Sequence, residues 1–82
     1  MKTHQSAARR PKPEHRYFCI LWEEDGEWTA HNPDLGAFGV GASKKSAIAD
    51  FAEAAKLMIS YIRSIGEELP PDRPIEVARA EF

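Results

Sequence analysis

Residues 17–30 read Tyr-Phe-Cys-Ile-Leu-Trp-Glu-Glu-Asp-Gly-Glu-Trp-Thr-Ala, and the rest of the chain can be interpreted from this stretch. Residues 17–22 are all apolar or aromatic and have the length of a strand that is apolar on both faces. Asp25-Gly26 is a strong signal for a tight turn, and residues 27–31 then alternate polar and apolar side chains. The stretch therefore predicts a β-hairpin whose first strand is central in a sheet.

A short third strand is predicted after the hairpin. Residues 32–34, Asn-Pro-Asp, end the second strand, because proline cannot donate to a ladder and Asn and Asp favour turns. Residues 36–41 then place Phe38 and Val40 among three glycines, which are expected to permit tight backbone turns. The spacing of these glycines matches neither a Walker loop nor a dinucleotide-binding fingerprint.

A long amphipathic helix is predicted over residues 44–65. Ser43 is a good N-cap, and the apolar residues that follow it repeat on one wide helical face. These positions are Ala47, Ile48, Phe51, Ala55, Met58, Ile59, Ile62 and Ile65. Gly66 suits the position after the helix end, and the prolines beyond it prevent continuation. Residues 75–80 are long enough for a final edge strand.

The predicted order is β-β-β-α-β, an α+β fold in which an antiparallel sheet is covered on one face by one long helix. Since residues 17–22 are apolar on both faces, the second face would leave large side chains in water unless another polypeptide covers it. A chain of 82 residues has room for one core of modest stability. Self-association into a homodimer or higher homo-oligomer is therefore expected.

Charge divides the chain into a basic arm and an acidic domain. Residues 1–16 carry five basic residues and one acidic residue, +4, and no periodic apolar positions, which predicts a flexible arm before a single domain at residues 17–82. The domain carries six basic and twelve acidic residues, −6, which favours a basic protein partner over nucleic acid. The arm is interpreted as a solubilising tail, with contact to nucleic acid or an acidic partner as the alternative.

No segment approaches the roughly 20 apolar residues of a membrane span, and the N-terminus lacks the apolar core of a secretion signal. No membrane association and a cytoplasmic location are expected. Cys19 is the only cysteine and lies in an apolar run, so it is interpreted as a buried structural thiol. Neither a disulfide within the chain nor a cysteine metal cluster is predicted.

The order and spacing of these segments resemble HicB-type antitoxins. The resemblance is carried by Phe18-Cys-Ile-Leu-Trp-Glu-Glu-Asp-Gly-Glu-Trp-Thr-Ala, Asn32-Pro-Asp-Leu, Gly39-Val-Gly-Ala-Ser and an alanine-rich helix, and it covers about residues 17–77. It implies a partial RNase H-like fold. It also implies a role in a toxin–antitoxin system, in which the domain binds a HicA-type toxin, a small basic ribonuclease that cleaves mRNA, and neutralises it by occlusion.

The chain departs from the family pattern in two places. Lys44 and Lys45 occupy the first helical turn, where the family helix opening is usually acidic and where the helix dipole disfavours positive charge. Many family members also carry a C-terminal operator-binding segment, which has no counterpart up to Phe82. Operator binding is therefore not implied.

The predicted partner-binding residues are the acids of the hairpin, with two tryptophans as apolar anchors, because aromatic residues often carry interface energy and acids meet a basic partner. These residues are Trp22, Glu23, Glu24, Asp25, Glu27 and Trp28. Lys44 and Lys45 beside a helix N-terminus are a candidate anion site, with solvated lysines as the alternative. The alternative function is a solitary, self-associating structural or regulatory domain without a toxin, in which a second copy fills the open face.

Catalysis is not predicted. A metal nuclease of the RNase H type needs carboxylates gathered on adjacent strands, whereas the acids here lie in the hairpin turn and on the helix, and residues 17–22 have none. His31 is the only histidine outside the arm and has no nucleophile beside it. It is interpreted as an exposed histidine at a strand end. No enzyme activity, no metal and no cofactor are expected.

Overall fold

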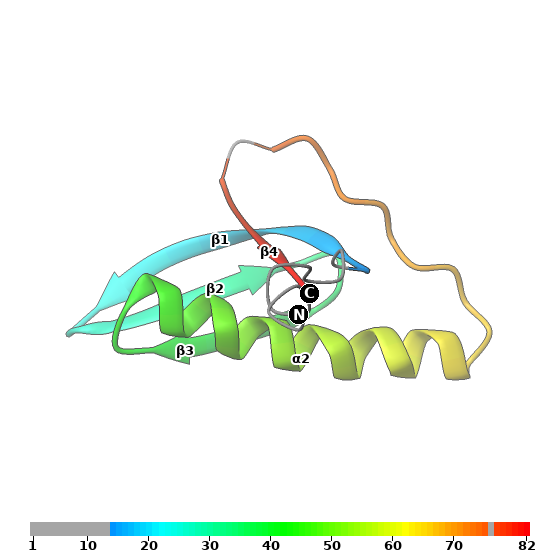
Figure 1. Ribbon diagram of the computed structural model, residues 1–82, viewed down its shortest axis with the longest axis horizontal. Helices are drawn as coiled ribbons and strands as arrows, with labels where there is room; N and C mark the ends of the chain where they lie inside the picture. Colours follow the sequence, from blue (N-terminus) through cyan, green and yellow to red (C-terminus); the bar gives the residue numbers. More distant parts are fainter. Residues whose placement is uncertain (1–13, 76) are drawn as a thin grey trace, which may run out of the picture.

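The computed structural model describes residues 14–75 and 77–82 and contains four strands and one long helix in these ranges. The elements are β1 (Arg16–Glu24), β2 (Glu27–Asn32), β3 (Ala37–Gly41), α2 (Lys44–Ser64) and β4 (Ala78–Glu81). The strands form one antiparallel sheet in the order β3-β2-β1-β4, and α2 lies along one face of it (Figure 1). The predicted α+β fold with the order β-β-β-α-β is confirmed. In the described part of the chain, no helix is long and apolar enough to cross a membrane.

The first strand of the hairpin, β1, begins one residue earlier and ends two residues later than the predicted strand at residues 17–22. Arg16 opens β1, where the sequence suggested that the arm still continued, and it pairs with Glu81 of β4. His15, also assigned to the arm, exchanges two backbone hydrogen bonds with Phe82, and residues 1–13 of the predicted arm lie outside the described residues. At the far end, β1 continues to Glu24, because the ladder with β2 extends up to the two-residue turn. Asp25 and Gly26 both have positive φ, 51° and 81°, as a tight hairpin turn requires.

The last strand is shorter than predicted, since it begins at Ala78 and not at residue 75. The amide of Ile75 donates to the carbonyl of Arg73, and the amide of Val77 donates to the carbonyl of Ile75, with N···O distances of 2.8 and 3.0 Å. These turns use backbone groups that a strand would have paired with β1. Only residues beyond them can join the ladder.

The helix begins and ends where local chemistry predicts. Ser43 is the N-cap, and its Oγ accepts from the amide of Ser46, while the Ser46 Oγ accepts from the amide of Ser43, which completes a capping box. At the other end, Gly66 has φ 76° and its amide donates to the carbonyl of Arg63. Ile65, which the sequence placed in the last turn, is the C-cap and is 49% exposed.

The core lies between α2 and the sheet, with the closest approach over β3. The buried helical residues are Ala47, Phe51, Ala55 and Ile59. A Cβ added at Gly39 would come within 2.6 Å of the Asp50 carbonyl carbon and 2.7 Å of the Ala47 carbonyl oxygen. At Gly41 it would lie 2.7 Å from the Ala47 amide nitrogen. The prediction that these two glycines permit tight turns was wrong, because they let the helix backbone rest on the strand. Of the three glycines in residues 36–41, only Gly36, with φ 71°, serves a turn.

Asn32 is fully buried at the end of β2 and joins two parts of the core. Its Nδ2 donates to the carbonyl oxygen of Phe18 at 2.8 Å, and its Oδ1 accepts from the amide of Leu35 at 2.8 Å. The side chain thus fixes β1 and the turn after β2 at once. This explains why the strand ends at an asparagine, which the sequence attributed to turn preference alone.

Replacing Asn32 by alanine is expected to lower the free energy of unfolding by about 2 kcal/mol, because a buried carbonyl and a buried amide each lose their partner. Urea denaturation followed by tryptophan fluorescence measures the loss. Ser64→Ala is the control, since it removes a hydrogen bond to the Tyr61 carbonyl at an exposed position and should change stability by no more than about 0.5 kcal/mol. Equal losses in the two variants would contradict this role of Asn32.

The segment between α2 and β4, here called the connector (residues 66–75 and 77), returns from the end of α2 to the sheet (Figure 1). Side chains of the connector contact Phe18. Phe18 does not belong to the core under α2, yet it is only 1% exposed. The Arg73 guanidinium carbon lies 5.5 Å from the centre of the Phe18 ring, and the backbone amide of Phe18 donates to the Asp72 carboxylate. On the helix side, the Tyr17 hydroxyl donates to the carbonyl of Pro70, and burial, aided by the Asp72 charge, raises the pKa of Tyr17. The expectation that helix packing leaves the whole second face open is therefore wrong at this end.

Charged side chains hold the connector in place. Arg73 makes a two-point ion pair with Asp34, with N···O distances of 2.7 and 3.0 Å. Arg79 binds Asp72 at 3.0 Å and also donates to the carbonyls of Arg73 and Ile75. Each of these arginines is thus neutralised by a carboxylate. The connector is fixed by these polar contacts although it has no regular secondary structure.

Candidate functional site: an open sheet face with an acidic end

The sheet face opposite α2, here called the open face, exposes a group of large apolar side chains. They are Ile20, Trp22, Phe38 and Val40, which are 41%, 41%, 62% and 42% exposed. Alternation along the strands puts all four on the same side, together with Thr29 and His31 of β2. The sequence predicted such a face, and its exposed part spans β1, β2 and β3.

The open face is hollowed at its centre. A hollow of about 360 Å³ is lined by Trp22, Glu24, Thr29, His31, Phe38 and Val40. His31 stands between two aromatic rings, with centroid distances of 6.4 Å to Trp22 and 6.0 Å to Phe38, and it meets both edge to face. His31 is therefore a half-buried member of an aromatic cluster with Trp22 and Phe38, and its interpretation as an exposed strand-end residue was wrong.

Four carboxylates surround the hairpin turn next to this hollow, and all are exposed. They are Glu23, Glu24, Asp25 and Glu27. The ion pairs found in residues 14–75 and 77–82 involve none of them. Glu24 and Glu27 lie directly opposite each other across the two strands. The hairpin end of the open face therefore carries uncompensated negative charge.

The six residues predicted to bind a partner do not form one surface. Trp22, Glu24 and Glu27 lie on the open face, and Asp25 lies in the turn. Glu23 and Trp28 face each other on the helix side. Trp28 packs against the core there, and the Lys44 Nζ lies 5.1 Å from its ring centre. The two tryptophans proposed as a pair of anchors thus occupy opposite faces.

The sequence interpretation omitted Ile20, Phe38, Val40 and His31 from the site. A usable signal was present, because a two-residue turn at Asp25-Gly26 fixes the register and hence the parity of every residue in β2. That register puts Trp22 opposite Thr29 and puts Trp28 on the other side. Carrying the alternation into the third strand would have added Phe38 and Val40.

The lysine pair predicted as a candidate anion site is exposed at the start of α2. The Lys44 ammonium is engaged with the Trp28 ring, and the Ser46 amide is already bound by Ser43. Anion binding at Lys44 and Lys45 stays a prediction.

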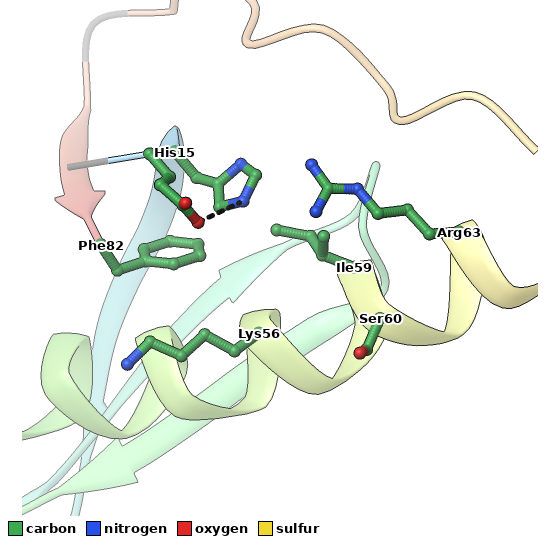
Figure 2. A pocket seen from close by; sticks show the side chains of 7 residues that line it. His15, Lys56, Ile59, Ser60, Arg63 and Phe82 are labelled. Carbon is green, nitrogen blue, oxygen red and sulfur yellow. Dashed lines mark ion pairs between the residues drawn. The ribbon is translucent and has the colours of Figure 1, made fainter.

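A second hollow of about 180 Å³ lies between α2 and the paired ends of β1 and β4 (Figure 2). Arg63 and His15 point toward each other across it, above Ile59. Glu14 also lines it, with its carboxylate 3.8 Å from the His15 Nε2. The charges in this hollow are mixed in sign, whereas those at the hairpin are all negative.

Chemistry at Cys19 is suppressed, because the thiol is fully buried and burial raises its pKa. In the described ranges, no group of three or more His, Cys, Asp or Glu side chains is arranged to hold a metal ion. The features that stand out are the apolar open face and the carboxylates at its end. Such an arrangement suits binding to another macromolecule.

Comparison with known proteins adds no relative: no protein-family model, no curated protein and no solved structure matches this chain. The resemblance to HicB-type antitoxins therefore stays a prediction that rests on the residues quoted above.

Proposed function

We propose that this chain is a HicB-like antitoxin domain that binds a small, basic, HicA-type ribonuclease toxin through the open face and blocks mRNA cleavage by occlusion. The observation that supports this proposal is the exposed apolar group Ile20, Trp22, Phe38 and Val40 directly beside uncompensated carboxylates. A protein partner that covers this face removes apolar surface from water, and an indole or phenyl ring is a common energetic centre of such contacts.

Charge favours a basic partner over a second copy of the same face. At the end of the sheet away from the hairpin, Arg16, Arg73 and Arg79 are paired with Glu81, Asp34 and Asp72. In a second copy these three arginines would already be engaged by their own carboxylates, so that end of the sheet offers little to the hairpin acids. A ribonuclease toxin, which must attract RNA, carries the positive charge that these acids would steer.

Self-association is a second candidate, and a different surface favours it. Leu57 and Tyr61 of α2 and its C-cap Ile65 are 73%, 57% and 49% exposed and follow one another at intervals of four residues. They form an apolar stripe on the helix, away from the open face. Analytical ultracentrifugation of the chain alone tests this: a dimer that Leu57→Glu converts to a monomer supports it, and a wild-type monomer removes it.

The test of the antitoxin function uses a HicA-type toxin encoded next to this chain. Isothermal titration at low salt should show a complex at micromolar concentration or tighter, and the complex should fail to cleave RNA that the free toxin degrades. Glu23→Lys/Asp25→Lys should weaken the complex by slowing association, since it reverses charge near the partner without changing the apolar face. Absence of binding at micromolar concentration and low salt would remove the proposal.

A further inference from the structure

The hollow on the open face results from a small residue surrounded by large ones. Trp22 of β1, Thr29 of β2 and Val40 of β3 lie directly opposite one another in one row across the sheet. Thr29 is the smallest of the three, so the space above it stays free between the indole and the isopropyl group. His31 and Phe38 stand in the next row and limit the hollow on that side.

The opposite side of the hollow is limited by the carboxylate of Glu24, and Glu27 lies beside it as its cross-strand partner. Glu24 and Glu27 form the following row of β1 and β2, and Glu24 lines the hollow itself. Two residues along a strand correspond to roughly 7 Å, so an extended side chain of four or five bonds reaches from the apolar row to the acidic row. Like charges directly opposite each other destabilise a strand pair. A cation placed between Glu24 and Glu27 would relieve this repulsion.

We infer that this hollow receives one arginine side chain of the basic partner. Its aliphatic stem lies on Thr29 between Trp22 and Val40, and its guanidinium group binds Glu24 and Glu27. The inference rests on the proposed function, which it deepens by naming the chemical group that the open face recognises. The two ends of the site suit the two parts of an arginine side chain. The apolar and aromatic residues contact the aliphatic stem, and the two carboxylates bind the planar cation.

Arginine fits this site better than lysine or an apolar side chain. Its guanidinium can donate to two carboxylates at once, stacks on aromatic rings, and loses less hydration free energy than an ammonium group when water is excluded. Lysine would satisfy one carboxylate as a point charge. An apolar side chain would fill the hollow but leave the repulsion between Glu24 and Glu27 in place.

The first experiment measures the affinity of the toxin for the variant Glu24→Gln/Glu27→Gln. We expect a loss of about ten-fold and a weaker dependence on salt, since a partly desolvated charge pair is removed. Glu23→Gln/Asp25→Gln is the matched control, because it removes the same number of charges from the same hairpin but not from the acidic row. Equal losses in the two variants would overturn the arginine site and leave the antitoxin function standing.

The second experiment does not need the toxin. The blocked peptide acetyl-Gly-Arg-Gly-amide is titrated into the ¹⁵N-labelled chain, with the same peptide containing citrulline, an uncharged isostere, as the control. We expect the arginine peptide alone to shift the indole N–H signal of Trp22, and Glu24→Gln/Glu27→Gln to abolish that shift. Such shifts would support the site even if no toxin bound. Equal shifts with both peptides, or none with the arginine peptide, would overturn it.

Discussion

Replacing Trp22 by alanine is expected to weaken the complex with a HicA-type toxin about 100-fold, because an aromatic anchor at the centre of an interface contributes more than 2 kcal/mol to binding. Trp22 has neighbours on the open face, among them His31, but it is 41% exposed in the isolated chain. Its removal should therefore change the free energy of unfolding by only about 1 kcal/mol. Isothermal titration and urea denaturation measure the two effects separately.

Trp28→Ala is the matched control for this prediction. The two tryptophans lie in the same hairpin, but Trp28 packs against the core under α2. Its removal should cost about 2 kcal/mol of stability, while the affinity measured under folded conditions should stay within about three-fold. If Trp28→Ala weakens the complex as much as Trp22→Ala, the partner does not bind the open face.

Gly39→Ala is expected to lower the free energy of unfolding by about 3 kcal/mol. The new methyl group would meet the backbone of α2 at Ala47, Asp50 and Phe51, and a backbone cannot move aside as a flexible side chain can. Domains of this size are stable by roughly 4 to 10 kcal/mol, so the variant should unfold at a clearly lower urea concentration. Urea denaturation followed by circular dichroism at 222 nm measures the change.

The control for this prediction is Gly66→Ala. Gly66 also carries a demanding feature, a φ of 76°, but no atom lies within 4 Å of its added Cβ. Its replacement should cost about 1 kcal/mol for the left-handed backbone alone. A Gly39→Ala variant no less stable than Gly66→Ala would show that the helix does not rest on β3.

The hairpin and the helix ends could be predicted because they depend on local chemistry. Asp25-Gly26 suits a two-residue turn whatever surrounds it, and both residues have the expected positive φ. Ser43 and Gly66 satisfy the orphan backbone groups of the helix from within a few residues of its ends. The register of the hairpin also followed from the turn, although the prediction of two tryptophans on one surface did not use it.

The candidate site was only half predictable for a related reason. A strand that is apolar on both parities, as residues 17–22 are, gives no indication of which face the helix will cover. The acids of the hairpin could be named from composition, yet Glu23 and Glu24 point to opposite sides once the strand is formed. The aromatic cluster of Trp22, His31 and Phe38 forms only when three strands pair in the correct register. The pairing of β3 with β2 depends on contacts that no single segment encodes.

By itself, the sequence determined the order of elements, the turn, the helix caps and the presence of surplus apolar surface, because each follows from side-chain periodicity or from backbone groups a few residues apart. Tertiary structure alone decided that Gly39 and Gly41 carry a helix backbone, and that the connector covers Phe18 through Arg73 and its partner Asp34, 39 residues away. Contacts of that kind depend on where the chain returns in space, so they arise only when the sheet, the helix and the connector pack together.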